Sequence, residues 1–282
     1  MIRLDPKDFA LWTTYIYSIS GISLDPSKAY LVETRFATLL KETNAPTFKA
    51  LYDKVTSDTT GALKRKVVVA ITTNETSFFR DSAPFEMLKH KIIPDLVDVR
   101  TKQQGKAKPV TLRVWSAACS TGQEVYSTAI CFKEVLRDLA KFDIRILGTD
   151  ISDKVVAQAS YGKYSKLEME RGLPPDKTGA YFVLDGPDYK VKDEIRSITT
   201  FKNLNLLEPL NFPNKFDIIF CRNVAIYFAE ADKRKLFDGI ARVLAPDGYL
   251  IIGSTETLVG ISQNFDSKRH IRSIYYQLRG LR

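Results

Sequence analysis

The second part of the chain alternates short apolar runs with amphipathic segments. The runs VTLRVWSAA, FDIRILGTD, FDIIFCRN and YLIIGS are rich in β-branched and aromatic residues, which is typical of buried strands. Between them, GQEVYSTAICFKEVLRDLAKF and EADKRKLFDGIARVLAPDG have the length and period of helices. Strands that alternate with helices form parallel sheets covered on both faces. The pattern therefore predicts a doubly wound α/β domain over residues 110–282.

Residues 1–80 carry helical patterns and few strand signals. Asp5-Pro6 is a favourable helix start, and a second helix is expected after Asp25-Pro26. In that helix, SKAYLVETRFATLLKE places four apolar side chains near one face, namely Leu31, Phe36, Leu39 and Leu40. Two further helices are expected over residues 47–56 and 62–72. These segments predict a small all-α N-terminal domain.

Two segments interrupt this simple division. Residues 81–109 are expected to form a helix from Ser82 to about Val99, followed by the polar linker RTKQQGKAKP. The strand–helix rhythm also breaks between about residues 160 and 198. There, YFVLDGPDYKVKDEI predicts an antiparallel strand pair, and hence a small β-subdomain inserted into the larger domain. The final stretch, RHIRSIYYQLRGLR, is expected to be one strand with a basic tail.

Composition excludes several classes of protein. Hydrophobic residues make up 44% of the 282, enough for a sizeable core. No apolar run approaches the roughly 20 residues of a membrane span, and the start lacks a signal core, so a cytoplasmic protein is expected. The cysteines have no paired spacing, so neither disulfides nor a metal site is expected. The net charge of +9 favours an acidic partner and keeps nucleic acid open.

Polar and small residues follow the predicted strands. Ligands bind beyond the carboxyl ends of parallel strands, and SAACSTGQE follows the first of them. Its single glycine, Gly122, does not make the pyrophosphate-binding fingerprint of dinucleotide enzymes. Asp150 ends the second strand, where an acid can accept hydrogen bonds from ribose hydroxyls or cap the next helix. Asn205 offers an amide suited to an adenine edge.

The fourth of these strand ends is FCRNVAIYF, which places Arg222, Asn223 and Tyr227 just beyond an apolar run. Each polar residue alone would be ordinary surface or a helix cap. Successive strand ends of this kind around one crevice favour a cofactor that contains a nucleoside but no pyrophosphate. S-adenosylmethionine fits that description.

The motifs TTNETSFFRD, RVWSAACSTGQEVYS, LGTDIS, FDIIFCRNVAIYF and LAPDGYLIIGSTE together resemble the chemoreceptor glutamate O-methyltransferase family, CheR. They occur in the family's order, from the helical domain to about Thr257. The resemblance implies a helical N-terminal domain, a Rossmann-like methyltransferase domain and an inserted β-subdomain. It implies transfer of a methyl group from S-adenosylmethionine to receptor glutamates, with S-adenosylhomocysteine as product and no metal.

The resemblance also implies roles for individual residues. Arg80 would orient the incoming carboxylate or nearby cofactor groups, and Tyr227 would lie near the transferred methyl group. Phe78 and Phe79 would anchor the segment that carries Arg80 in the core. The cofactor contacts that the resemblance implies, besides Arg80, are Asn74, Thr76, Glu124, Asp150, Asn205, Leu206, Arg222 and Asn223.

The implied partner is the cytoplasmic domain of methyl-accepting chemotaxis receptors, bound by a monomer. A basic face with Lys28, Arg35 and Lys41 would suit a receptor helix rich in Glu, although a solvated face explains these charges equally well. Gln123-Glu124-Val125 departs from the family's usual Glu-Glu-Pro. The loop LDGPDYK is short, so we expect no dependence on the C-terminal receptor pentapeptide that tethers some members.

Other functions stay open on the sequence alone. A nucleic-acid methyltransferase would share the cofactor and suit the charge, but RNVAIY lacks the Asn/Asp-Pro-Pro-aromatic motif of amino-methylating enzymes. A sensor or scaffold could keep the cofactor pocket without transfer. A nicotinamide dehydrogenase is the weakest alternative, because the glycine fingerprint is missing.

Overall fold

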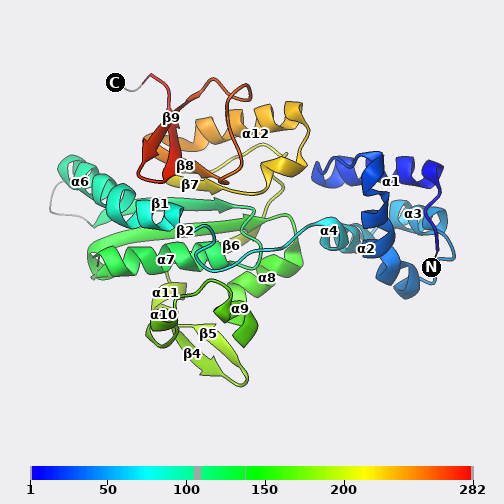
Figure 1. The fold of residues 1–282 in the computed structure, drawn as a ribbon, viewed down its shortest axis with the longest axis horizontal. Coiled ribbons are helices and arrows are strands. Elements are labelled where there is room, and N and C mark those ends of the chain that lie inside the picture. Colours follow the sequence, from blue (N-terminus) through cyan, green and yellow to red (C-terminus); the bar gives the residue numbers. More distant parts are fainter. Residues whose placement is uncertain (1, 105–108, 137, 281–282) are drawn as a thin grey trace.

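The computed structural model describes residues 2–104, 109–136 and 138–280. A cluster of helices lies beside one end of a mixed sheet, and residues 72–82 connect the two (Figure 1). No helix in the described parts of the chain is both long and apolar enough to cross a membrane. The helical domain contains α1 (Pro6–Ser20), η1 (Pro26–Lys28), α2 (Ala29–Glu42), α3 (Phe48–Ser57) and α4 (Ala62–Ile71).

The helical domain has its own hydrophobic core. Trp12 is fully buried, its ring meets Phe36 edge-on at 4.8 Å between centroids, and its Nε1 donates to the carbonyl of Phe48 at 3.2 Å. Asp5 caps α1 by accepting from the Lys7 N–H, as its sequence predicted. The expected apolar face of α2 is confirmed at Phe36, Leu39 and Leu40, but Val32 is buried there and Leu31 is only partly buried.

A 7-stranded sheet forms the second domain, in the order β6-β2-β1-β7-β8-β10-β9. The strands from β6 to β8 are parallel, whereas β10 is antiparallel to both of its neighbours. The expected single C-terminal strand is therefore an antiparallel hairpin at one edge. The strands are β1 (Val110–Ala117), β2 (Phe142–Asp150), β6 (Thr199–Asn203), β7 (Phe216–Cys221), β8 (Leu244–Ile252), β9 (Phe265–His270) and β10 (Ser273–Leu278).

Helices cover both faces of this sheet, as predicted. Leu112 and Phe220 point to the face that packs against α7 (Gln123–Leu136) and its neighbours. Trp115 and Ile219 point to the opposite face, which α12 (Glu230–Val243) covers. Alternate residues of a strand face opposite sides, so each central strand contributes to both cores. The end of the predicted last helix, LAPDG, lies in β8 instead.

The segment before the sheet is more helical than predicted. α5 (Ala83–Met87), the π-helical turn η2 (Leu88–Ile92) and α6 (Ile93–Gln104) follow one another directly. Arg100, which we expected in a linker, is buried and forms ion pairs with Asp217 and Asp247. The linker prediction fails here because these acids hold the last turns of α6 against the sheet. Residues 105–108 lie outside the described residues.

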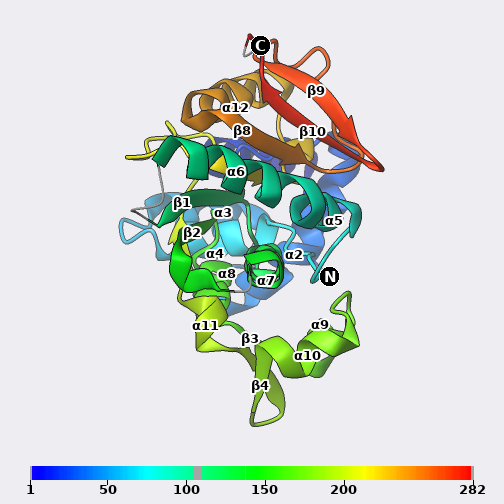
Figure 2. The ribbon, with the colours of Figure 1, turned by 90° about the vertical axis from the view of Figure 1, so that its left-hand side faces the viewer.

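The insert projects from the sheet domain at the end of α8 (Asp153–Tyr161) (Figures 1 and 2). The predicted hairpin is present, with Asp185 paired to Asp188 across Gly186 and Pro187. A third strand and several short helices were not predicted. The insert consists of β3 (Lys163–Tyr164), α9 (Lys166–Glu170), α10 (Pro175–Tyr181), β4 (Phe182–Asp185), β5 (Asp188–Val191) and α11 (Asp193–Arg196).

Candidate active site

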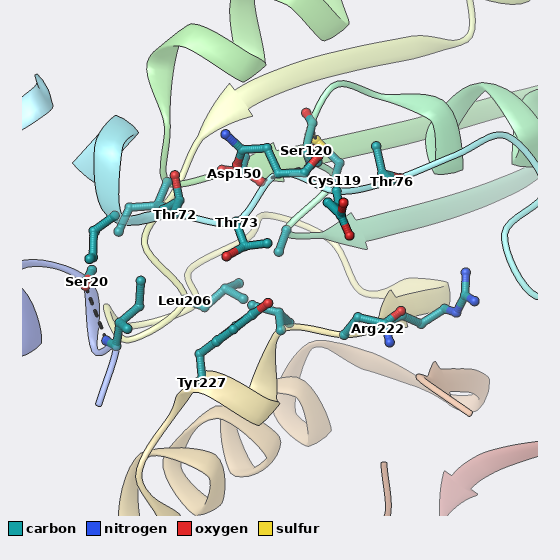
Figure 3. A pocket seen from close by; sticks show the side chains of 18 of the residues that line it. Ser20, Thr72, Thr73, Thr76, Cys119, Ser120, Asp150, Leu206, Arg222 and Tyr227 are labelled. Carbon is teal, nitrogen blue, oxygen red and sulfur yellow. Dashed lines mark hydrogen bonds between the residues drawn. The ribbon is translucent and has the colours of Figure 1, made fainter. Parts of the chain in front are cut away.

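A cavity lies where the carboxyl ends of the strands meet the helical domain (Figure 3). The chain moves outward from β1 through β2 to β6 and then returns to β7 on the other side of β1. The gap between β1 and β7 is thus the topological switch point, where sheets of this kind bind ligands. All ten cofactor and catalytic residues predicted from the sequence line this cavity: Asn74, Thr76, Arg80, Glu124, Asp150, Asn205, Leu206, Arg222, Asn223 and Tyr227.

The loop after β1 turns sharply beneath this cavity. Ala118 and Ser120 have left-handed backbone conformations, with φ of 60° and 50°, and Gly122 has φ of 95°. Left-handed non-glycine residues are uncommon and are concentrated at ligand sites. The Cys119 N–H donates to the Thr149 carbonyl at 2.8 Å, which holds the turn against β2. The loop therefore presents small side chains and backbone to a ligand.

Asp150 is at the end of β2, with 7% of its surface exposed. One carboxylate oxygen accepts from the Ser120 N–H at 2.9 Å, and the other accepts from the Ser152 N–H at 3.0 Å. Burial raises the pKa of Asp150, and these N–H donors act in the opposite direction. An ionised carboxylate has about four acceptor positions, so both oxygens can still accept from a ligand.

Arg222 forms the centre of a buried ionic cluster. Its side chain is 3% exposed, and it donates to Glu124 and to Asp81, both at 2.8 Å. It also donates to the Arg80 carbonyl at 3.0 Å. The other oxygen of Glu124, which is expected to contact the cofactor, accepts from the Ser116 hydroxyl. The sequence interpretation missed Asp81, although the acid lies in the TTNETSFFRD motif.

Asn223 is held by a residue that the sequence interpretation did not assign. Its N–H donates to Glu256 Oε2 at 2.8 Å, and the same oxygen accepts from the Gly253 N–H at 2.7 Å. Asn223 has a left-handed φ of 56°, so these bonds stabilise an otherwise unfavourable backbone. The signal for Glu256 was its position at the end of the LAPDGYLIIGSTE motif.

The connecting segment, residues 72–82, crosses one side of the cavity. The Ser120 hydroxyl donates to the Asn74 carbonyl at 2.9 Å and thereby joins this segment to the β1 loop. The Arg80 guanidinium donates to the Glu75 carbonyl at 3.0 Å. Phe78 is fully buried and Phe79 is packed against the same core, so the predicted aromatic anchors are present.

The opposite wall is apolar. Figure 3 shows Leu206 and Tyr227 across the cavity from Cys119, Ser120 and Asp150.

Asn205, predicted to bind an adenine edge, uses its side-chain amide within the protein. Its Nδ2 donates to the Ile19 carbonyl at 3.4 Å, and its Oδ1 accepts from the Leu207 N–H. Its side chain therefore joins the two domains.

The three predicted docking residues differ in their environment. Lys28 lies in η1 and Lys41 near the end of α2, and both are exposed. At 100° per residue, Lys41 lies about 120° around the helix from Arg35. Arg35 is partly buried in the cavity wall and donates to the Ile71 carbonyl and the Thr73 hydroxyl. Arg35 therefore also braces the connecting segment, and receptor docking by the three basic residues stays a prediction.

These features fit S-adenosylmethionine. Asp150 keeps acceptor capacity for ribose hydroxyls, the small residues of the β1 loop permit close approach, and Leu206 and Phe228 provide apolar surface for a base. The helical domain contributes Ile22, Leu24 and Leu31, for which the sequence carried no site signal. Among the described residues, no group of His, Cys, Asp and Glu side chains is arranged to hold a metal ion.

Models of two protein domains match consecutive parts of the chain. Residues 7–72 match the CheR methyltransferase all-alpha domain, and residues 74–273 match the CheR methyltransferase SAM binding domain. The chain is 36% identical over 274 residues to chemotaxis protein methyltransferase 1 of Pseudomonas aeruginosa, covering 96% of this chain and 97% of the relative. It is 34% identical over 281 residues to chemotaxis protein methyltransferase 1 of Vibrio cholerae, covering 99% of each. The protein therefore belongs to the CheR methyltransferase family.

Proposed function

We propose that the protein transfers the methyl group of S-adenosylmethionine to glutamate side chains in the cytoplasmic domain of chemotaxis receptors. Its membership of the CheR family and the names of its relatives support this reaction. The single structural observation that carries the proposal is the cavity at the switch point. It combines a buried acid at the end of β2 with an arginine on the segment that crosses one side of the cavity.

The cavity divides into parts with different tasks. Asp150 would accept from the ribose hydroxyls, and the turn from Ala118 to Gly122 would lie against the methionine portion. Leu206 and Phe228 would bury the base. When bound, the cofactor supplies an electrophilic methyl group on a sulfonium. The chain must therefore bring a carboxylate oxygen into line with that methyl group.

The acceptor needs little acid–base assistance. A glutamate side chain with a pKa near 4.3 is already ionised at neutral pH. Positioning of the reactants can contribute roughly 7–11 kcal/mol to lowering a barrier, and it is the main contribution open to these side chains. The protein contributes geometry and charge around an acceptor that is ready to react.

Arg80 has the charge required to orient that carboxylate. Arg222 is neutralised by Glu124 and Asp81, whereas Arg80 forms no ion pair within the described residues. Its guanidinium donates to the neutral Glu75 carbonyl, which an incoming carboxylate can displace because a hydrogen-bonded ion pair is stronger than a bond to a neutral acceptor. Arg80 would thus hold the substrate, and Tyr227 would shape the opening for the methyl group.

The test is transfer of labelled methyl groups to cytoplasmic receptor fragments, with mild alkali used to release methanol from carboxyl esters. Arg80→Ala should lower kcat about 100-fold, the size seen when one charge-stabilising donor is lost. Arg242→Ala is the control, because Arg242 is exposed on α12 outside the cavity. Normal turnover of Arg80→Ala would remove Arg80 from the mechanism. S-adenosylhomocysteine binding without transfer to any receptor would favour a sensor or another acceptor, including nucleic acid.

We further propose that activity does not depend on a C-terminal receptor pentapeptide. The β4–β5 connection consists of Gly186 and Pro187 alone, which supports the expectation of a short loop. Titration of the protein with such a peptide in a calorimeter should give no measurable heat of binding. Tight binding would contradict this proposal. It would not bear on the proposed methyl transfer, which the transfer assay tests separately.

A further inference from the structure

We propose that two residues of the insert, Gly172 and Tyr164, are positioning residues for methyl transfer. Gly172 fixes the main chain of Phe78, and Tyr164 fixes its ring. Phe78 lies two residues before Arg80. This inference rests on the proposed role of Arg80 in the reaction. It makes the inserted subdomain part of the support for the active site.

The ring of Phe78 is buried against the insert. It is 0% exposed, and it packs edge-on against Tyr164 in β3, with 4.9 Å between centroids, and against Phe182 in β4, at 5.4 Å. Edge-to-face pairs of this kind stabilise a contact beyond the burial of area alone. The connecting segment is therefore anchored by side chains that lie about 85 to 105 residues later in the sequence.

Gly172 fixes the main chain at the same point. It follows α9 and has a φ of 98°, in the region that favours glycine. A Cβ atom at this position would lie 2.2 Å from the Phe78 carbonyl oxygen and 3.5 Å from the Ser77 hydroxyl. Backbone thus packs on backbone. Any side chain at position 172 has to push the connecting segment away or distort the insert.

Tyr164 supports both sides of the cavity. Its ring contacts Phe78, and its hydroxyl donates to the Thr121 carbonyl in the β1 loop at 2.7 Å. The same loop is joined to the connecting segment by the bond from Ser120 to the Asn74 carbonyl. Tyr164, the β1 loop and the connecting segment therefore form a closed set of contacts around the cofactor cavity.

The turn from Phe78 to Arg80 is constrained, so a displacement at Phe78 would be passed on to Arg80. Phe79 and Asp81 have left-handed conformations, with φ of 49° and 58°, which are rare for non-glycine residues. The Phe79 N–H donates to the Ser127 hydroxyl at 2.9 Å, and Arg222 holds the Arg80 carbonyl. A turn held in this way has few alternative conformations, so its anchor determines where the Arg80 guanidinium lies.

The primary experiment compares Gly172→Ala with Gly179→Ala. Gly179 is the matched control because it lies in the same insert and a Cβ there would meet nothing within 4 Å. Misplacement of about 1 Å can cost 10²-fold in rate, so Gly172→Ala should lower kcat about 10- to 100-fold without changing KM for the receptor fragment. Its dissociation constant for S-adenosylhomocysteine should rise about fivefold, the equivalent of one hydrogen bond. Gly179→Ala should match the wild type in each measurement.

A second pair of variants covers the case in which Gly172→Ala does not fold. Tyr164→Phe keeps the ring against Phe78 and removes the bond to Thr121, whereas Tyr164→Leu removes both. Both should bind S-adenosylhomocysteine less tightly, and kcat should be substantially higher for Phe than for Leu. Circular dichroism and thermal unfolding establish that the compared variants are folded.

The inference is overturned if folded Gly172→Ala and Tyr164→Leu both keep the wild-type kcat and the wild-type affinity for S-adenosylhomocysteine. Equal losses in Gly172→Ala and Gly179→Ala would also overturn it, because they would indicate general damage to the insert. If the wild type transfers no methyl group to receptor fragments, the proposed function fails instead. The binding comparison then still decides whether the insert positions the cavity.

Discussion

Asp150 shapes the backbone around the cavity, in addition to its proposed role as an acceptor for ribose hydroxyls. Its two oxygens accept from Ser120 and Ser152, so the carboxylate shapes the β1 loop and the start of α8 before any ligand arrives. Burial raises its pKa from the ordinary 3.8, because the ionised carboxylate is less stable in the folded protein than in water. A ligand that donates hydrogen bonds would compensate for part of the lost hydration.

This arrangement predicts how cofactor affinity depends on pH. As the pH falls through the raised pKa, Asp150 becomes protonated and loses acceptor capacity, so the affinity for S-adenosylhomocysteine should fall. The loss of affinity should begin at a higher pH than it would for an aspartate with an ordinary pKa. At pH values well above the raised pKa, the affinity should not depend on the ionisation of Asp150. Calorimetric titrations across the acid range measure it. In Asp150→Asn the affinity should be weak and nearly independent of pH; an unchanged acid dependence in that variant would assign the titration to another group.

At the scale of elements, Arg222 connects parts of the chain that are distant in sequence. It follows β7, and its partners are Glu124 at the start of α7 and Asp81 before α5. The end of a central strand, the start of a helix and the connecting segment therefore meet at one guanidinium. A guanidinium buried in this way needs such partners, because a desolvated ion costs several kcal/mol unless it is paired.

Removal of this guanidinium should destabilise the fold. Arg222→Met leaves Glu124 and Asp81 close together without a counter-charge, and breaking a buried pair in this way costs about 3–5 kcal/mol. Because the Asp81 side chain is 39% exposed, solvent screens part of the loss, and we expect about 3 kcal/mol. Urea unfolding measures the change. Arg234→Met is the control, because its pair with Glu230 is exposed and should contribute little to the free energy of unfolding. Similar losses in the two variants would contradict the role given to Arg222.

At the scale of the whole molecule, the cavity exists because two domains meet. Ile22 forms an isolated antiparallel bridge with Phe228, and the Ser23 N–H donates to the Tyr227 carbonyl at 3.0 Å. The Tyr17 hydroxyl donates to the buried Asp232 carboxylate at 2.5 Å. Each domain has its own core, so these contacts, together with the bond from Asn205 to the Ile19 carbonyl, help to hold the helical domain over the strand ends.

Weakening this contact should weaken cofactor binding from a distance. Tyr17→Phe removes one hydrogen bond between the domains, so affinity for S-adenosylhomocysteine should fall about fivefold. Neither Tyr17 nor Asp232 lines the cavity, so a direct contact would not explain the loss. Tyr30→Phe is the control, because Tyr30 is exposed on α2. Calorimetry gives both affinities, and equal values in the two variants would show that the domains stay closed without the Tyr17 bond.

The sequence by itself determined the order and type of most elements in this protein. Periodicity of apolar residues is a local property, and it predicted the helices of the first domain, the central strands and the β4–β5 hairpin. Polar residues directly after buried strands identified Asp150 and Arg222, because strands covered on both faces leave their ends as the place for a ligand. The resemblance to the family motifs assigned the connecting segment with Arg80 to the same site.

Only the tertiary structure decided which polar groups pair with one another. Glu124 and Asp81 neutralise Arg222, Asp217 neutralises Arg100, and Asn205 joins the two domains. These partners are separated by many residues, so no local pattern indicates them. Pairing depends on where the folded backbone places each group and on how much water remains there. The contact of Gly172 with Phe78 also depends on the tertiary structure. That position 172 has no room for a side chain becomes clear only when the backbone of Phe78 is in place.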